Sequence, residues 1–342
     1  MARASQVRFG LFDQVEKPDE RPLGQVYQDH FALIEAAEDA GFHGVYKSEH
    51  HHVPLDAAPS INLYLSALTQ RTERIRIGSL VHLLPFYEPM RLYEELCMLD
   101  HLSGGRIDFG FGKGVSPPEH MLWHIDRGEI EERTAESLDI VLGAMRAHRL
   151  HGPGHLFTYE GQFWSYEDAP LEVGPLQDPH PPLWRPGTLD TAAEMGVSTI
   201  VAGPIDMAAA SLERYRELQR PGVSPDQEPT VSVLRRIHMA ATDEEADRRA
   251  RAAWATFDAN LTKLFRRYDV WPPHVPSFLG DYEKAIATES LVTGGPSKVR
   301  QHFEELLETT GAEHVMVCLS WGDLAGEEVR RSLDLFAEHV RG

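Results

Sequence analysis

Three adjacent histidines, His50, His51 and His52, follow Glu49 at the end of a predicted strand, Gly44–Ser48. Imidazole at such a position is typical of a general acid or base, because its pKa lies near neutrality. Successive residues of an extended chain point to opposite sides, so at most His50 and His52 share a side. No HExxH or CxxC pattern supplies further metal ligands. We therefore predict no metal, and surface histidines in a loop remain the other interpretation.

Two further segments combine glycine with a basic residue: Gly110-Phe111-Gly112-Lys113-Gly114 and Arg185-Pro186-Gly187-Thr188. Glycines let backbone amides approach an anion, and Lys113 adds a positive charge. Arg185 stands just before a predicted helix that begins near Thr188, and a helix N-terminus favours phosphate. The spacing fits neither a P-loop nor a Rossmann turn. A ligand-free glycine turn and an incidental arginine beside an N-cap are the alternatives. Together the segments predict a cofactor that carries phosphate.

The elements that must position these residues alternate along the chain. Short β-branched or apolar runs are followed by amphipathic helical segments, which is typical of a parallel sheet wrapped by helices. Close to eight such units predict a (β/α)8 TIM barrel, formed as a single domain by residues 1–342, with its site at the carboxyl ends of the strands. The predicted strands are Val7–Phe12, Gly44–Ser48, Ile75–Val81, Ile107–Phe111, Leu183–Arg185, Ser198–Ala202, Val231–Ala241 and His314–Leu319.

Two irregular stretches, at about 150–182 and 268–293, are predicted to be insertions in the barrel. In the first, Leu156–Tyr159 and Gln162–Trp164 flank Glu160-Gly161 and predict a hairpin. The second is a candidate lid. Four aromatic residues are candidates for an apolar pocket, with ordinary core as the alternative: Trp271, Phe278, Phe12 and Trp321.

The composition excludes several classes of function. A formal charge of −20 over 342 residues disfavours nucleic acid and anionic membranes as main partners, although a local basic pocket still accommodates an anionic cofactor. Cys97 and Cys318 lie in apolar patterns and are expected to be buried thiols. The sequence contains neither a GxSxG motif nor an apolar run of about 18 residues, and no signal peptide is visible in Met1–Phe12. We expect a cytoplasmic protein.

Over nearly its whole length the chain resembles the luciferase-like flavin monooxygenases. The most specific part of the resemblance is Leu99–Gly114, which includes the glycine-rich turn. The other matching segments are Glu49-His50-His51, Arg74–Gly78, Pro89-Met90-Arg91, Gly295-Pro296-Ser297 and Arg331–Phe336. The resemblance implies a monooxygenase that uses O2 and reduced FMN, supplied by a separate flavin reductase, to oxidise a small, largely apolar organic substrate. It also implies a homodimer.

The resemblance assigns roles to individual residues. His50 resembles the catalytic acid or base, and Glu49 resembles a residue that meets the flavin ring. Phosphate contacts are implied for Lys113 with Gly114 and Val115, for Arg133, and for Arg185 with Thr188. The peptide between Leu80 and Val81 matches a non-proline cis peptide at the cofactor.

Three departures limit this transfer. Lys113 replaces an arginine and lacks its bidentate fork, while Arg185 stands where the light-emitting relative has a small polar residue. Gly112 occupies the place of a reactive cysteine, which argues against a light-emitting enzyme with an identical pocket. A deazaflavin-dependent hydride-transfer enzyme and a non-catalytic flavin-binding subunit remain alternatives. An aldehyde, ketone, terpene or sulfonate substrate is compatible, but a sulfonate would need more basic residues near the mouth.

Overall fold

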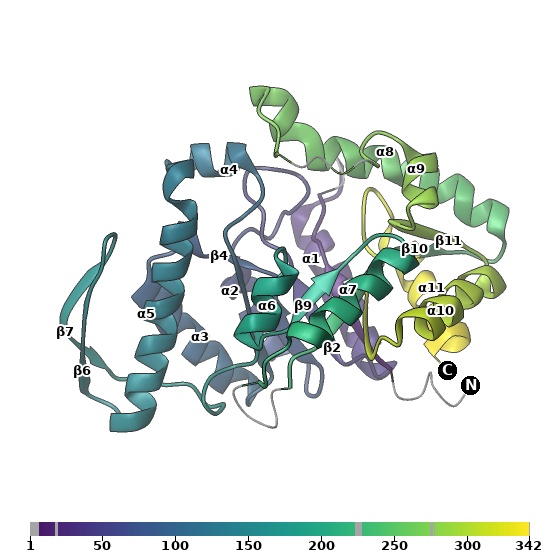
Figure 1. Ribbon diagram of the computed structural model, residues 1–342. Coiled ribbons are helices and arrows are strands. Elements are labelled where there is room, and N and C mark those ends of the chain that lie inside the picture. The colour runs from purple at the N-terminus through teal and green to yellow at the C-terminus, as the bar shows by residue number, and fades with distance from the viewer. Residues whose placement is uncertain (1–6, 18–19, 223–227, 274–275, 277, 342) are drawn as a thin grey trace.

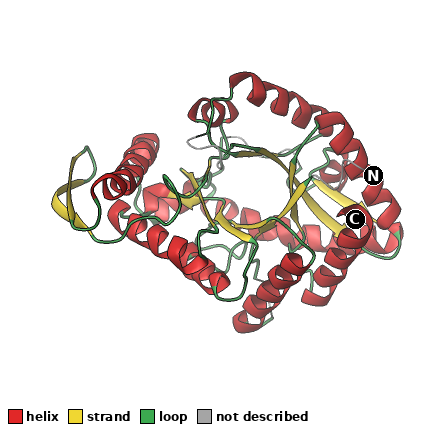
Figure 2. Cartoon of the chain, turned by 90° about the horizontal axis from the view of Figure 1, so that it is seen from below, coloured by secondary structure: helices red, strands yellow, loops and turns green. Residues whose placement is uncertain are grey.

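Short strands alternate with helices in the computed structural model, which describes residues 7–17, 20–222, 228–273, 276 and 278–341. Within this described part, neighbouring strands of the main sheet pair in parallel. The sheet curls around a central space, and the helices lie outside it (Figures 1 and 2). The predicted α/β architecture is therefore confirmed in its general form.

The strand order of the main sheet is β11-β10-β12-β1-β2-β3-β5-β4, with β8 paired to β5 and β9 paired to β10. An isolated parallel bridge joins Trp184 to Ser198, next to β8 and β9. There the amide of Ser198 donates to the oxygen of Leu183 at 3.0 Å, and the amide of Arg185 donates to the oxygen of Ser198 at 2.8 Å. The strands are β1 (Arg8–Asp13), β2 (Gly44–Lys47), β3 (Arg76–Ser79), β4 (His82–Leu83), β5 (Ile107–Gly112), β8 (Leu183–Trp184), β9 (Thr199–Val201), β10 (Val231–Met239), β11 (Leu291–Gly294) and β12 (His314–Cys318).

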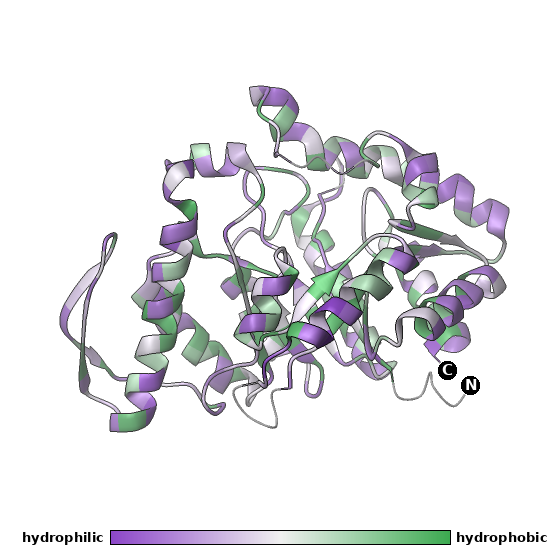
Figure 3. Ribbon diagram, in the orientation of Figure 1, coloured by the Kyte–Doolittle hydropathy of each residue, from purple (hydrophilic) through white to green (hydrophobic). Residues whose placement is uncertain are grey.

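Alternate residues of the strands face two different environments, as the period of two in a strand requires. One face packs against the helices and forms the large apolar core, which includes Phe9, Ile77 and Val233. The opposite face lines the central space, where a smaller cluster gathers Tyr46, Leu80, Trp184 and Met316. The hydropathy colouring follows this division: hydrophobic residues mark β9, while outer helices such as α8 and α10 carry many hydrophilic ones (Figure 3).

The outer helices bury one apolar face each and begin or end at recognisable residues. In α3, Pro89 is the first residue and the Glu88 carboxylate accepts from the amide of Arg91 at 2.7 Å, whereas Gly104 ends the helix with φ 68°. The helices are α1 (Leu23–Asp39), α2 (Ile61–Thr69), α3 (Pro89–Ser103), α4 (Pro117–Leu122), α5 (Ile130–His151), α6 (Leu189–Met195), α7 (Ile205–Leu218), α8 (Asp243–Tyr268), α9 (Tyr282–Ala287), α10 (Pro296–Thr310) and α11 (Gly326–Phe336).

The first irregular stretch forms a hairpin, but its second strand differs from the prediction. The strands are β6 (His155–Glu160) and β7 (Ser165–Leu171), so the predicted strand Gln162–Trp164 is wrong and lies in the turn. The physical reason is the carboxylate of Glu136 on α5, which accepts hydrogen bonds from the amides of Gln162, Phe163 and Trp164 at 2.9–3.2 Å. These amides therefore have no need of a strand partner. The hairpin stands beside α5 (Figure 1).

The second irregular stretch is less irregular than predicted. Residues 268–293 contain α9 and most of β11, a strand that the sequence reading missed because its apolar run is only Leu291-Val292. Trp271 packs against Phe265, with ring centroids 5.6 Å apart, and Phe278 packs against Trp254 at 5.8 Å. Residues 274, 275 and 277 of the candidate lid lie outside the described residues. The same holds for residues 1–6, which are half of the segment Met1–Phe12 in which no signal peptide is visible.

Cys97 and Cys318 are both buried free thiols, as predicted. Burial raises the pKa of the Cys97 thiol well above its ordinary value and raises the pKa of the Cys318 thiol to about 11. Among the described residues, no helix combines the length and the apolarity that crossing a bilayer requires.

Candidate active site

A cavity of about 250 Å³ opens where the strands of the sheet end, at the carboxyl side of β1, β2, β3, β5 and β8. It brings together nine of the ten residues that the sequence and the resemblance singled out. These are Glu49, His50, Leu80, Val81, Lys113, Gly114, Val115, Arg185 and Thr188. A larger cavity of about 430 Å³ lies at the opposite, amino-terminal ends, lined by Arg8, Arg76 and Asp108 among others. We assign the site to the first cavity, because sheets of this type carry their chemistry at the carboxyl ends.

His50 is paired with a carboxylate that sequence reading missed. Its Nδ1 atom lies 3.3 Å from Oε1 of Glu119, which is buried on the short helix α4. Burial by itself would lower the pKa of His50, but the charge and hydrogen bond of Glu119 outweigh it and hold the pKa above its ordinary value. Pairing through Nδ1 leaves Nε2 as the ring nitrogen available for proton transfer. The spacing between Glu119 and the glycine-rich turn matches no known motif, so the sequence does not predict that Glu119 pairs with His50, and only the fold shows it.

Glu49 is a buried carboxylate held in one orientation by three donors. Its Oε1 atom accepts from Nε2 of His51 at 2.8 Å, and Oε2 accepts from the amide of Leu83 at 3.1 Å and the hydroxyl of Tyr87 at 3.0 Å. Burial nevertheless raises the pKa of Glu49. His51 is therefore occupied with Glu49, and His50 with Glu119. The adjacent histidines thus diverge, and the described residues contain no cluster of three or more groups suited to a metal.

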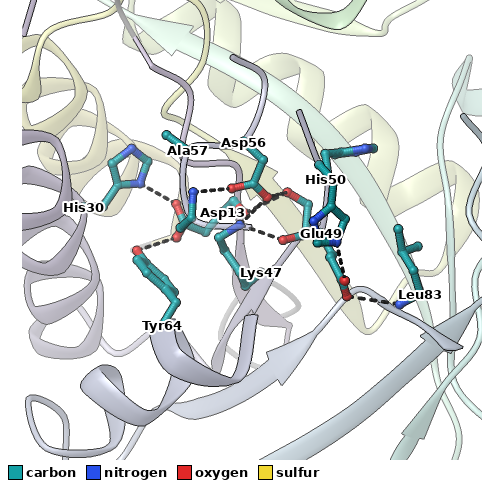
Figure 4. Close-up of polar contacts among 12 residues, drawn as sticks. Asp13, His30, Lys47, Glu49, His50, Asp56, Ala57, Tyr64 and Leu83 are labelled. Carbon is teal, nitrogen blue, oxygen red and sulfur yellow. Dashed lines mark hydrogen bonds and ion pairs between the residues drawn. The ribbon is translucent and has the colours of Figure 1, made fainter. Parts of the chain in front are cut away.

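A buried network of charges supports the segment that carries His50 (Figure 4). Lys47, at the end of β2, forms an ion pair with Asp56 and donates to the oxygen of Ser48 at 2.6 Å. Asp13, at the end of β1, accepts from Nδ1 of His30 at 2.6 Å and from the hydroxyl of Tyr64 at 2.8 Å. Burial alone would raise the pKa of Asp13, but His30 and Lys47 hold it below its ordinary value. These contacts fix the backbone between β2 and α2.

The peptide between Leu80 and Val81 is cis, as predicted, and it interrupts the predicted strand Ile75–Val81 between β3 and β4. The neighbouring strand β5 approaches it closely. A Cβ on Gly110 would collide with the backbone oxygen of Ser79, and a Cβ on Gly112 would lie 2.8 Å from Cγ2 of Val81. The glycines of the Gly110–Gly114 turn therefore bring two backbone segments together at the cavity wall.

Lys113 reaches the cavity but is engaged by an acid. Its ammonium forms an ion pair with Glu131 on α5, and both side chains are more than half exposed. The backbone oxygen of Lys113 lies 2.8 Å from Nε2 of His120, and Gly114 follows with φ 83°. Glu131 and Thr134 also line the cavity, although neither was singled out from the sequence. Both lie on α5, whose helical period turns them toward the strand ends.

Arg133 does not line this cavity. Its guanidinium lies 4.2 Å over the ring of Phe163 in the hairpin turn, and Nη2 lies 3.0 Å from Glu129. Arg185 does line it, and its Nη1 atom donates to Sδ of Met195 at 3.4 Å. Thr188 is the N-cap residue of α6, a helix of seven residues, but its side chain accepts no hydrogen bond from the first turn of that helix. Lys113 and Arg185 thus meet at one cavity, and Arg133 stays with the hairpin.

Of the four aromatic residues predicted to shape an apolar pocket, Phe12 lines the cavity. Trp321 is 1% exposed, and its indole nitrogen donates to the oxygen of Ile237 at 3.0 Å. The rings of Trp271 and Phe278 pack on α8 residues, as described above. The interpretation as ordinary core therefore accounts for Trp321 and Phe278, whereas Trp271 is 39% exposed and belongs neither to the core nor to the cavity lining.

A curled parallel sheet, with a largely apolar cavity at its carboxyl ends that also holds a few charged side chains, is the arrangement of the barrel-like α/β enzymes. The chain belongs to the luciferase-like monooxygenase family, which it matches over residues 7–314. It is 33% identical to the uncharacterized protein y4wF of Sinorhizobium fredii, over 94% of this chain and 92% of that one. It is 25% identical to the oxygenase component of a flavin-dependent trigonelline monooxygenase of Acinetobacter baylyi, over 70% and 67% of the two chains.

The fold agrees with this membership. The oxygenating constituent of 3,6-diketocamphane monooxygenase from Pseudomonas putida, solved in complex with FMN, superposes with a TM-score of 0.79 at 20% identity, over 98% of each chain. The chain is therefore an enzyme of an oxidoreductase family, and the resemblance inferred from its motifs is confirmed.

Proposed function

We propose that the protein is the oxygenase of a two-component monooxygenase, which binds reduced FMN from a separate reductase and uses O2 to oxidise a small organic substrate. The observation that carries the proposal is the convergence of Lys113, Arg185 and the His50–Glu119 pair on one cavity at the strand ends. The related trigonelline enzyme is an oxygenase component, and the diketocamphane enzyme binds FMN, which supports both the cofactor and the division of labour.

Lys113 and Arg185 would bind the phosphate of FMN, because both cationic side chains line the same cavity. Thr134 and Gly187, whose φ is 102°, stand at the same cavity and would complete the phosphate end. Phosphate binding requires Lys113 to leave Glu131, so the carboxylate of Glu131 competes with the cofactor.

The flavin ring would lie against Glu49 and the Leu80–Val81 backbone. Three hydrogen bonds hold the Glu49 carboxylate in place, and glycines at 110 and 112 leave the facing strand without side chains. The bound flavin supplies electrons for the reaction with oxygen. The apolar residues Phe12, Leu83 and Val81 would limit the access of water to the ring.

His50 would move the proton of the reaction. Glu119 holds its Nδ1 atom, which orients the ring and leaves Nε2 facing the reactants. Because Glu119 also favours the charged imidazole, His50 takes up a proton readily and releases it against this attraction.

We also propose that the curled sheet is a closed eight-stranded barrel, with the bridge between Trp184 and Ser198 as its seam. A homodimer is proposed from the adjacent helices α2 and α3, on which Leu63 is 74% and Met98 is 53% exposed. The hydrogen bond of 2.7 Å from Asn62 to Glu95 joins these two helices. Light scattering on the purified protein tests the dimer.

The deciding experiment is an anaerobic titration with reduced FMN, followed by oxygen uptake with a panel of aldehydes, ketones, terpenes and carboxylated ring compounds. The proposal expects saturable binding and substrate-dependent oxygen uptake. Preferential binding of reduced deazaflavin, with product formed without oxygen, would replace it by hydride transfer. Flavin binding without oxygen uptake on any substrate would favour a non-catalytic subunit.

A further inference from the structure

The cavity of about 430 Å³ at the amino-terminal ends of the strands has no part in the proposed flavin site. The curled sheet surrounds the space into which this cavity leads (Figure 2). Four aromatic rings line it: Tyr46, Trp184, His43 and His314. The ring centroids of Tyr46 and Trp184 lie 5.0 Å apart, and that of His314 lies 5.7 Å from both Trp184 and His43. The cavity therefore has a floor of packed rings.

His314 brings to this floor a buried polar atom that lacks a partner. It is fully buried on β12 and shares the inner face of the sheet with Met316, two residues further on. Its Nδ1 atom lies 2.9 Å from the hydroxyl of Ser232, but Nε2 has no hydrogen-bond partner in the described part of the chain. Such an atom costs free energy unless a bound group satisfies it.

The Ser232 hydroxyl determines which hydrogen the His314 ring carries. Burial, together with the nearby charge of Arg8, holds the pKa of His314 well below its ordinary value, so the ring is neutral. Ser232 is fully buried, and its side chain makes one hydrogen bond to the described residues, with Nδ1 of His314. When the hydroxyl donates to Nδ1, the ring hydrogen stays on Nε2. Nε2 is then a donor that requires an acceptor.

Arg8 places a positive charge beside this donor. Arg8 of β1 and His314 of β12 are direct partners in the register of the sheet, and both line the cavity. Among the residues that the structure describes, no acid forms an ion pair with Arg8. Neighbouring strands lie roughly 4.8 Å apart, so the guanidinium and Nε2 of His314 are within reach of one small acceptor group.

The second arginine of the cavity is already neutralised. Arg76 forms an ion pair with Asp108, in which Nε lies 2.8 Å from Oδ1. The other oxygen of Asp108 accepts from the hydroxyl of Tyr46 at 2.9 Å and from the indole of Trp184 at 3.2 Å. This closed network holds the rings in place and leaves Arg8 as the charge to be matched.

Two exposed carboxylates at the rim limit the charge of a ligand. Asp178 forms an ion pair with Arg149 at 2.8 Å, and Glu228 is exposed. Both line the cavity and oppose a second negative charge there. A dianion such as a phosphate monoester is therefore disfavoured, and a single negative charge matches Arg8.

We propose that this cavity is a second binding site, which takes a small organic acid with one carboxylate and an apolar body. Arg8 and Nε2 of His314 would donate to the two carboxylate oxygens, since a charged donor beside a neutral one matches this group. The half-buried His43, Pro182 and Pro229 would pack on the body. None of the described residues lines both this cavity and the flavin cavity, so the inference does not depend on the proposed FMN site.

Calorimetric titration of the FMN-saturated protein with phenylacetate and with its neutral counterpart phenylacetamide tests this proposal. We expect the wild type to bind phenylacetate at least fivefold more tightly than phenylacetamide. Arg8→Met should abolish this preference, and Arg8→Lys should retain part of it. His314→Phe, which keeps a ring but removes the donor, should weaken phenylacetate binding severalfold. Arg330→Met, which removes an exposed arginine on α11, is the matched control and should change nothing.

Equal binding of the two probes by the wild type, or an unchanged preference in Arg8→Met, would overturn the proposal. A crystal soaked with phenylacetate provides a second measurement, which does not depend on how the variants fold. The carboxylate must lie within hydrogen-bond distance of both the Arg8 guanidinium and Nε2 of His314. Density for phenylacetate in the flavin cavity alone, or for water alone at Nε2, contradicts the inference. If FMN itself does not bind, the proposed function fails, while the same titration and soak without FMN still decide on this site.

Discussion

The Nδ1 atom of His50 and the Oε1 atom of Glu119 lie 3.3 Å apart, although 69 residues separate them in the sequence. The strand β2 delivers the histidine, and a helix of six residues after the glycine-rich turn delivers the carboxylate. This relationship ties His50, the proposed acid–base group, to the segment that carries Lys113. A shift of the turn on cofactor binding would therefore be felt at His50.

Removing either member of this pair should have a distinct effect. His50→Ala removes the proton carrier and should lower kcat by roughly 10²- to 10⁴-fold, with FMN affinity nearly unchanged. Unchanged turnover in this variant would contradict the role. Titration of FMN into the variant is the control.

Glu119→Gln should alter the pH dependence. Glu119 raises the pKa of His50, so its loss lowers that pKa. The limb of the pH–rate profile that reports deprotonation of His50 should then move to lower pH. The measurement is kcat/KM as a function of pH for both proteins. A limb that stays in place would show that another group titrates there.

Lys113 and Arg185 should govern the affinity for the phosphate of FMN. Lys113→Ala and Arg185→Ala should each weaken FMN binding at least tenfold, because a charge-assisted hydrogen bond contributes roughly 1.5–3 kcal/mol. Binding of riboflavin, which lacks the phosphate, should hardly change. Arg133→Ala is the matched control, since its guanidinium lies over Phe163, away from the cavity. An equal loss of FMN affinity in all three variants would show that Arg133 also binds the phosphate.

The buried pair of Lys47 and Asp56 should stabilise the fold. Both side chains are completely buried, so Lys47→Met leaves an uncompensated carboxylate and should lower the free energy of unfolding by about 3–5 kcal/mol. The double variant Lys47→Met with Asp56→Asn should lose less than the sum of the single variants, because their effects are coupled. Urea denaturation of the four proteins measures this coupling. Strict additivity would show that the pair is energetically unimportant.

Gly110 should tolerate no side chain. Gly110→Ala places a methyl group against the backbone oxygen of Ser79, which should lower stability by about 1–3 kcal/mol and weaken FMN binding through the displaced cavity wall. Gly24→Ala is the same substitution at a helical position with no atom within 4 Å, and it should be neutral or stabilising. Thermal unfolding of the two variants compares them directly. Equal melting temperatures would show that β5 can move away from Ser79.

The sequence alone predicts the strands that position the site, because their apolar runs end in glycine, histidine or arginine. Residues at strand ends were found for this reason, and the family resemblance supplied their roles. The sequence does not predict Glu119, Glu131 and Thr134 as site residues, because they lie on helices. The direction in which such a side chain points depends on how its helix packs against the sheet. Arg133 also lies on a helix, but here the prediction placed the side chain at the cofactor, whereas its guanidinium lies over the ring of Phe163, away from the cavity.

The ion pair between Lys113 and Glu131 has a consequence for selectivity among anions. Glu131 is a ligand tethered beside its own binding partner, so its effective concentration at Lys113 is high. A chloride or acetate ion must displace this built-in competitor with a single charge, whereas a phosphate monoester brings nearly two. With Lys113 in its proposed role, the unloaded enzyme should resist occupation by common cellular anions and still accept a flavin that carries phosphate.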